Sequence, residues 1–114
     1  MHHEMTLFPR PYASIASGQK TIELRLYDEK RQSIQIGDQI RFTNTEDASQ
    51  TTLCEVVGLH VFKDFRELYE KLPLLQCGYT PEDVDNAHPD DMLTYYSKEK
   101  QAQYGVVGIE LKRI

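Results

Sequence analysis

The sequence is poor in residues that mark several classes of protein. It contains no tryptophan and two cysteines in 114 residues. Cys54 and Cys77 are too few for a disulfide scaffold and lack the spacing of a metal-ligand motif. No apolar run approaches the roughly 20 residues that span a bilayer, and no signal peptide with a basic start and an apolar centre is present. These absences exclude a disulfide-rich secreted domain and a membrane protein, and they leave the cytoplasm as the expected compartment.

Two clusters of potential metal ligands lack the pattern of a metal site. His2 and His3 are followed by Glu4, but neighbours at a chain end form only a weak site, and we expect them to be frayed. The carboxylates of residues 82–91 are not spaced like a calcium-binding loop, and they lack its turn glycine. Acidic side chains are favourable near the start of a helix, and this explains the run of carboxylates better than a metal site does. The sequence therefore predicts no metal and no organic cofactor.

The overall composition is that of one folded soluble domain covering residues 1–114. Hydrophobic residues make up 39% of the chain and charged residues 27%, which excludes a disordered tail. A chain of this length buries roughly two-thirds of the surface that its unfolded form exposes. That burial supports a single core and leaves no room for a second domain.

The net charge of −5 argues against binding to duplex nucleic acid, but the charge is unevenly distributed. Residues 1–42 carry six basic and five acidic side chains, whereas residues 43–100 carry five basic and twelve acidic ones. The basic surface typical of high-affinity duplex binding is absent. A pocket for one nucleotide or a short single strand remains compatible with this distribution.

The first half of the chain is predicted to consist mostly of strands. Apolar and alternating patterns place strands at residues 5–8, 21–26, 39–42 and 51–62. A short helix is expected over residues 12–16, because apolar residues repeat there at helical spacing and Gly18 supplies a stop. Residues 43–50 are polar without periodicity, which predicts a hairpin loop. Gly58 predicts a bend or bulge in the last strand.

The second half is predicted to be helical before a final strand. Helices are expected at residues 65–72, from residue 81 onward and at 89–96, followed by a strand at 104–111. Asp64 is a plausible N-cap for the first helix, and residues 80–83 have the form of a capping box. Met92, Leu93 and Tyr96 are expected to face inward. Strands, then helices, then a returning strand predict an α+β fold, a small mixed barrel with a helical insertion.

One strand carries the most informative polar residues. Glu23 and Arg25 are two residues apart, so both side chains point to the same face, and Lys20 lies at the strand entrance. Two cations beside one carboxylate can hold it ionised. The group offers donors for a phosphate or a base edge and one acceptor for an amine. The alternative, which the spacing alone favours, is a solvated strand face with an ion pair.

The same segment carries a family resemblance. It has the pattern Gly-x-Lys-x-x-Glu-x-Arg, formed by Gly18, Lys20, Glu23 and Arg25. This pattern resembles the signature of ASCH (activating-signal-cointegrator homology) domains. An aromatic-proline pair at residues 8–9, a Gly-Asp turn at residues 37–38 and the final apolar strand fit the same family. The resemblance thus covers essentially the whole chain.

The resemblance implies both a fold and a function. ASCH domains are similar to PUA domains, so it implies a PUA-like mixed β-barrel with helices packed at the barrel openings. It also implies a cleft beside the barrel that binds RNA or a nucleotide. By this resemblance Lys20, Glu23 and Arg25 line that cleft.

A second function follows from small bacterial members of the same superfamily. They include amidohydrolases that deacetylate N(4)-acetylcytidine with a lysine, a threonine and a distant glutamate. Lys20 matches the lysine, but Glu23 stands where the threonine is expected, and the hydroxyl of Thr21 is only one residue after the lysine. Glu82 is the candidate for the distant glutamate. In the mechanism this implies, Glu23 activates water, and Lys20 or Arg25 stabilises the oxyanion.

Further ligand contacts are expected beside the motif. Arg31, in the charged segment 28–31, can contact a phosphate. Arg10, which two flanking prolines hold, can also point into the cleft. Tyr27 can stack on a base, and Thr21 adds a hydroxyl. The alternatives are a charged hairpin turn for Arg31 and an amphipathic packing role for Tyr27.

Two functions therefore stay open from the sequence. One is a binding module for RNA or a nucleoside, and the other is an amidohydrolase that acts on an acylated nucleoside. Whether the chain is an enzyme is left undecided. The acidic second half slightly favours a small ligand over an oligonucleotide. No membrane partner is expected.

Overall fold

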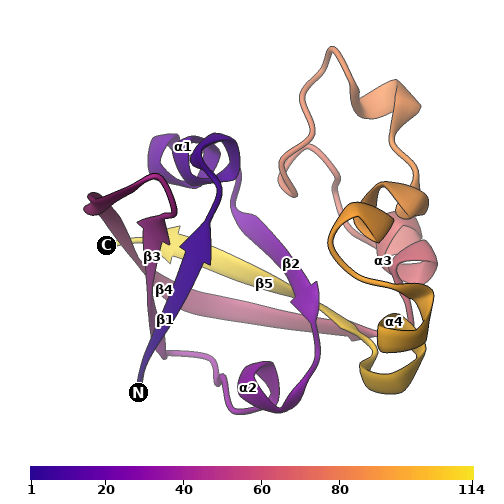
Figure 1. The fold of residues 1–114 in the computed structure, drawn as a ribbon, viewed down its shortest axis with the longest axis horizontal. Coiled ribbons are helices and arrows are strands. Elements are labelled where there is room, and N and C mark those ends of the chain that lie inside the picture. Colours follow the sequence, from indigo (N-terminus) through magenta and orange to yellow (C-terminus); the bar gives the residue numbers. More distant parts are fainter.

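Five strands form one mixed sheet that curls into a half-barrel (Figure 1). The computed structural model describes all residues from 1 to 114. Along the sheet the order is β1-β3-β4-β5-β2. The strands are β1 (His2–Leu7), β2 (Ile22–Leu26), β3 (Gln39–Asn44), β4 (Asp47–Phe62) and β5 (Val106–Arg113). Only β1 and β3 are parallel. This confirms the α+β fold with a barrel-like sheet.

Helices connect the strands and form the insertion between β4 and β5. They are α1 (Pro9–Ser17), α2 (Glu29–Gln32), α3 (Phe65–Lys71) and α4 (Lys98–Tyr104), with 3-10 helices η1 (Val84–Asn86) and η2 (Pro89–Thr94). In Figure 1, α1 and α2 lie at opposite ends of the half-barrel, and the insertion lies beside β2. None of the helices has the length and the hydrophobicity that a membrane-spanning helix needs.

Two hydrophobic clusters explain this arrangement. The larger one fills the half-barrel below α1 and includes Ile15, Phe42 and Ile109. The smaller one joins the apolar face of β2 to α3, where Leu24 packs in the same cluster as Phe65. Alternation along β2 therefore directs its apolar residues into the cluster shared with the insertion and its polar residues toward the opposite side.

The start of the chain is ordered, so the prediction of fraying at residues 2–4 is wrong. His3 is buried in β1, and its Nε2 lies 2.8 Å from a carboxylate oxygen of Asp38. Parallel pairing of β1 with β3 holds the same residues in the sheet. A buried partner and a neighbouring strand thus replace the solvation that a free terminus would have.

The hairpin between β3 and β4 is tighter than predicted. Residues 43–50 do not form an open loop, because β3 extends to Asn44 and β4 already starts at Asp47. The side chains of residues 45–50 are exposed, so pairing of the backbone rather than burial sets the structure there. The predicted irregularity near Gly58 is confirmed by a register shift between Val56 and Gly58.

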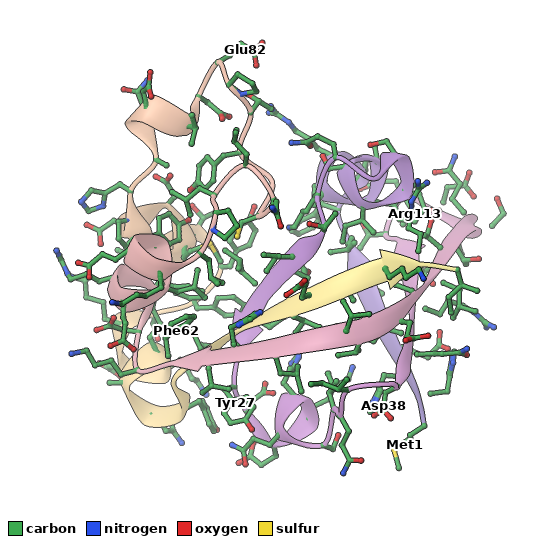
Figure 2. The ribbon with its side chains drawn as sticks, turned by 180° about the vertical axis from the view of Figure 1, so that it is seen from behind. Met1, Tyr27, Asp38, Phe62, Glu82 and Arg113 are labelled. Atoms are coloured by element: carbon green, nitrogen blue, oxygen red, sulfur yellow. The ribbon has the colours of Figure 1, made fainter.

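The insertion is less helical than predicted. Its first helix is confirmed, because the Asp64 side chain accepts a hydrogen bond of 2.9 Å from the Glu67 amide at the start of α3. At residues 80–83 only one of the two hydrogen bonds of a capping box forms, from the Thr80 amide to the Asp83 carboxylate. The single turn η1 follows it. Figure 2 shows Glu82 at the outer end of this segment.

Two further differences concern residues 89–104. A 3-10 helix replaces the expected α-helix at 89–96, and Leu93, expected to face inward, is 40% exposed. The prediction for Leu93 is therefore wrong, since a 3-10 helix has a different side-chain period from an α-helix. The short helix α4, which the Ser97 side chain caps, was not predicted.

Candidate functional site

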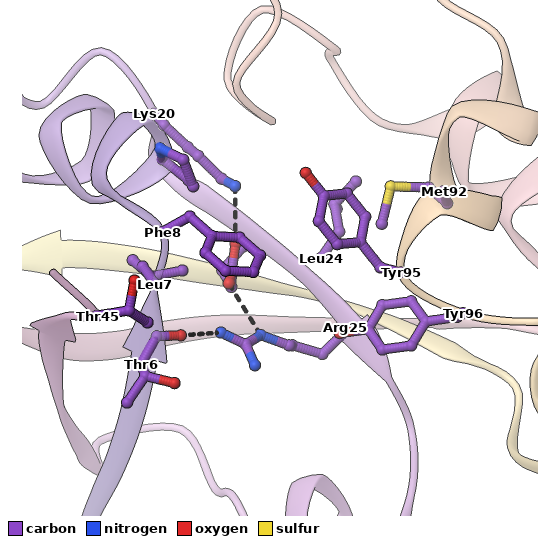
Figure 3. Close-up of a pocket in the computed structure, with 12 residues that line it drawn as sticks. Thr6, Leu7, Phe8, Lys20, Leu24, Arg25, Thr45, Met92, Tyr95 and Tyr96 are labelled. Atoms are coloured by element: carbon purple, nitrogen blue, oxygen red, sulfur yellow. Dashed lines mark hydrogen bonds and ion pairs between the residues drawn. The ribbon is translucent and has the colours of Figure 1, made fainter.

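A cavity of about 250 Å³ lies at the open side of the half-barrel (Figure 3). The edge strands β1 and β2 both contribute to it, and they have no backbone pairing with each other. The 3-10 helix η2 and the residues after it form the opposite wall. The lining residues are Thr6, Leu7, Phe8, Pro11, Lys20, Glu23, Leu24, Arg25, Thr45, Met92, Tyr95 and Tyr96.

Three ionic side chains meet in this cavity. Lys20 Nζ lies 2.7 Å from Glu23 Oε1, and Arg25 Nε lies 2.9 Å from Glu23 Oε2. Glu23 is only 4% exposed, so its carboxylate is buried between the two cations. The alternative of a solvated strand face is wrong, because the polar face of β2 turns toward β1 and η2 rather than toward water.

Local backbone contacts hold Lys20 at the strand entrance. Gly18 ends α1 with a φ of 86°, which is the left-handed conformation that glycine adopts without strain. The Lys20 amide then donates to the Ser14 carbonyl at 3.0 Å. The next two amides, of Thr21 and Ile22, both donate to the Gln76 carbonyl. The turn before β2 is thereby tied to α1 and to the insertion.

Arg25 joins the two edges of the sheet. Its Nη2 donates to the Thr6 carbonyl of β1 at 2.9 Å, while its Nε binds Glu23 on β2 (Figure 3). A guanidinium presents several donors in a planar fork, so one side chain can satisfy both partners. Arg25 therefore occupies the position where backbone hydrogen bonds would otherwise close the barrel.

The electrostatics of the group follow from its burial. Burial alone would raise the pKa of Glu23, but the charges of Lys20 and Arg25, with their hydrogen bonds, outweigh it and lower that pKa. Burial would lower the pKa of Arg25, and the neighbouring Glu23 carboxylate reverses this and raises it. Glu23 is therefore ionised and Arg25 protonated at neutral pH. By formal charge, the lysine, the arginine and the one carboxylate leave the group with one excess positive charge.

The groups left free for a ligand are mainly donors. Both Glu23 oxygens already accept hydrogen bonds, while the Lys20 ammonium has three donors and uses one on Glu23. The hydroxyls of Thr6 and Thr45 also line the cavity. A ligand edge rich in acceptors, such as carbonyl groups and ring nitrogens, complements this set.

Aromatic side chains surround the mouth of the cavity. Phe8 is 57% exposed and Tyr95 is 55% exposed, although both line it. In the view of Figure 3 the Phe8 ring lies between the ends of Lys20 and Arg25, the Tyr95 ring lies beside Leu24, and Tyr96 lies beside Arg25. Exposed aromatic faces beside buried charges form a surface on which a planar ring can stack.

The other predicted site residues are spread more widely. Arg10 lies beside this cavity, in a second one described below. Thr21 donates its hydroxyl to the Gln76 side chain, and Arg31 pairs with Asp28 at 2.9 Å. Tyr27 packs against the half-barrel core. Thr21, Tyr27, Arg31 and the exposed Glu82 do not line the cavity.

Several lining residues were not predicted. Phe8 lies in the aromatic-proline pair, but its spacing gave no sign that its ring faces a cavity. Thr45 and Met92 carry no motif at all, and only the tertiary fold brings them beside β2. Tyr95 is adjacent to Tyr96 in the sequence, and this spacing does not define which way either ring points. No group of three or more His, Cys, Asp or Glu side chains is placed to hold a metal ion.

Comparison with known proteins gives a consistent family. A family model described as the ASCH domain matches residues 5–114. A search of curated proteins found no match. The crystal structure of hypothetical protein PH0355 is similar over the full length of both chains, with 34% identity and a TM-score of 0.80.

Two further solved structures share the fold. The solution NMR structure of protein PF0455 from Pyrococcus furiosus has 33% identity and a TM-score of 0.71, covering 100% of this chain and 98% of that one. The crystal structure of ASCH from Zymomonas mobilis has 14% identity and a TM-score of 0.64, covering 96% of this chain and 65% of that one. At that identity the likeness concerns the fold alone. The match of the family model to residues 5–114 places this chain in the ASCH domain family.

Proposed function

We propose that the cavity binds one nucleobase, carried by RNA or by a modified nucleoside. The observation that carries the proposal is the buried group of Lys20, Glu23 and Arg25 at a cavity flanked by exposed aromatic rings. A base has a planar face for stacking and an edge of acceptors and donors, which matches both parts. ASCH domains are in general RNA-binding, and this supports the same ligand class.

The size of the cavity supports a small ligand. Its volume of about 250 Å³ is slightly below the range of about 300–1,000 Å³ that is typical for drug-sized ligands. One base, or a base with part of its sugar, suits this space, whereas a duplex does not. Specificity then depends on hydrogen bonds between the base edge and the donors of Lys20 and Arg25.

The charge distribution supports a local contact over an extended one. The twelve acidic side chains of residues 43–100 repel a long phosphate backbone. Affinity therefore depends on the cavity and on few phosphate contacts, so its dependence on salt is shallow. A strongly salt-dependent affinity for long RNA would contradict this part of the proposal.

A panel of free and modified nucleosides tests the proposal. A ligand that binds only the folded protein raises its stability, by about 2.7 kcal/mol at one hundred times the dissociation constant. We expect at least one nucleoside to raise the melting temperature of the wild type and to have no such effect on Lys20→Met. Lys112→Met is the matched control, because Lys112 is exposed and does not line the cavity. Failure of every nucleoside would refute nucleoside binding.

Hydrolysis of an acylated nucleoside is a second candidate function of the same cavity. One observation favours it, since a lysine ammonium and a carboxylate lie 2.7 Å apart inside the cavity. Glu23 would accept a proton from the water that attacks the acyl carbon, and Lys20 would stabilise the oxyanion formed on the acyl oxygen. The C–N bond would then break as that proton passes from Glu23 to the leaving amine. The lowered pKa of Glu23 makes it a weak base, so the structure favours binding over turnover.

A direct assay separates the two functions. Purified protein is incubated with N(4)-acetylcytidine, and cytidine and acetate are measured. Turnover that is lost in Glu23→Gln, with nucleoside binding retained, would establish the hydrolytic function. Binding without turnover in the wild type would leave the cavity as a recognition site only.

A further inference from the structure

A second compartment adjoins the cavity. It has a volume of about 290 Å³, and the charged residues among those that line it are Arg10, Lys20, Asp83 and Asp91. Four of its lining residues, Pro11, Lys20, Met92 and Tyr95, also line the first cavity. The two spaces therefore form one groove between α1 and η2, and Lys20 lies at their junction.

We propose that this compartment binds the phosphodiester next to the base, so that the ligand is a short single strand of RNA rather than a free nucleoside. The inference rests on the function proposed for the first cavity and specifies its substrate class. A base and its flanking phosphate are adjacent parts of one strand, as the two compartments are adjacent parts of one groove.

Lys20 can contact both parts of such a ligand. Its aliphatic chain lies against Gly78, where a Cβ atom would be only 3.2 Å from Lys20 Cδ. Its ammonium binds Glu23 at 2.7 Å and retains two further donors. One amine at the junction can thus bridge a base acceptor and a phosphate oxygen.

Arg10 supplies the second cation. It is exposed, lies between two prolines in the first turn of α1, and lines the compartment. Its guanidinium makes no hydrogen bond or ion pair within the protein. A guanidinium that is free to bind presents two parallel donors to a phosphate, which is its most favourable geometry with that group.

The acidic residues of the compartment are already engaged. The Asp91 carboxylate accepts hydrogen bonds from the Tyr79 hydroxyl at 2.6 Å and from the His88 amide at 3.2 Å. Asp83 accepts from the Thr80 amide at 2.6 Å. These bonds engage one oxygen of each carboxylate, and both negative charges remain. A phosphodiester with one charge is therefore tolerated better than a terminal phosphate with up to two.

The test compares three ligands that share one base: the nucleoside, its 3′-monophosphate and the dinucleoside phosphate. Dissociation constants are measured for the wild type, Arg10→Gln and Arg66→Gln. Arg66 is the matched control, since it is also an exposed arginine at the second position of a helix, and it lines neither compartment of the groove. We expect the dinucleoside phosphate to bind about tenfold tighter than the nucleoside, as one charge-assisted contact predicts.

Each outcome bears on the proposal. Arg10→Gln should abolish the tenfold gain and leave the affinity for the nucleoside unchanged, whereas Arg66→Gln should change neither. Equal affinities for the nucleoside and the dinucleoside phosphate would overturn the inference and leave nucleoside binding intact. Tighter binding of the monophosphate than of the dinucleoside phosphate would overturn the assignment to a strand. Absence of binding by all three ligands would refute the first cavity's function itself.

Discussion

Removal of the Lys20 charge should destabilise the protein through Glu23. In Lys20→Met the chain length and much of the packing are kept, but the Glu23 carboxylate, 4% exposed, loses one of two cationic partners. Breaking a fully buried pair costs about 3–5 kcal/mol. Arg25 still binds the other oxygen at 2.9 Å, so we expect a loss of about 2 kcal/mol in the free energy of unfolding at pH 7.

A double-mutant cycle isolates this effect. Urea unfolding is measured for the wild type, Lys20→Met, Glu23→Gln and the double variant. Residues in direct contact show coupling energies of about 0.5–3 kcal/mol, and we expect a value in the upper part of that range. Lys112→Met should stay within about 0.5 kcal/mol of the wild type. A coupling near zero would refute the argument that Lys20 compensates the buried carboxylate.

The pH dependence gives an independent readout of the same pair. The pKa of Glu23 is lowered in the folded state, so its stabilising contribution is full above the unfolded pKa and is lost as the pH falls through the folded pKa. Lys20→Met removes part of the lowering. Its extra loss of stability should therefore shrink as the pH falls and the carboxylate becomes protonated. A loss that is the same at every pH would contradict the electrostatic explanation.

Three further predictions concern the fold. Asp64→Ala removes the N-cap of α3 and should lower the free energy of unfolding in urea by about 1 kcal/mol; an unchanged midpoint would contradict this. Gly108→Ala places a Cβ atom 2.6 Å from Leu72 Cδ1, so calorimetry should show a loss of about 1–3 kcal/mol in the free energy of unfolding. A raised melting temperature would show that the space beside Gly108 is not filled by Leu72. The hydrogen bond to His3 is the main reason that the pKa of Asp38 falls to about 2 from 3.8. Asp38→Asn should accordingly destabilise the protein above pH 3.8, and in acid titrations this loss of stability should become smaller toward pH 2. A loss of stability that stays the same at pH 2 would exclude the Asp38 charge as its cause.

Local patterns predicted the elements whose structure is set by their own residues. The alternation at residues 21–26 defined β2, because each polar residue is followed by an apolar one that the core requires. The same alternation placed Glu23 and Arg25 on one face. It did not show that this face is buried, since burial comes from β1 and η2, which are distant in the sequence.

Other features depend on contacts that no local pattern encodes. The segment at residues 43–50 is polar and is exposed from residue 45 onward, yet backbone pairing with β3 extends β4 into it. The segment at 89–94 has apolar residues at α-helical spacing, but a 3-10 helix forms with Met92 inward and Leu93 outward. Thr45 reaches the cavity only because β1 and β3 are paired in parallel. The ligand roles of Lys20 and Arg25 remain predictions.

The central claim is that the buried ionic group and the aromatic rings beside it receive one nucleobase. An NMR titration of isotope-labelled protein with a nucleoside tests it most directly. We predict saturable shifts of the Lys20, Glu23 and Arg25 signals together with those of Phe8 and Tyr95, and little change at Lys112. Saturable shifts confined to other surfaces, or none with any nucleoside, would contradict the claim.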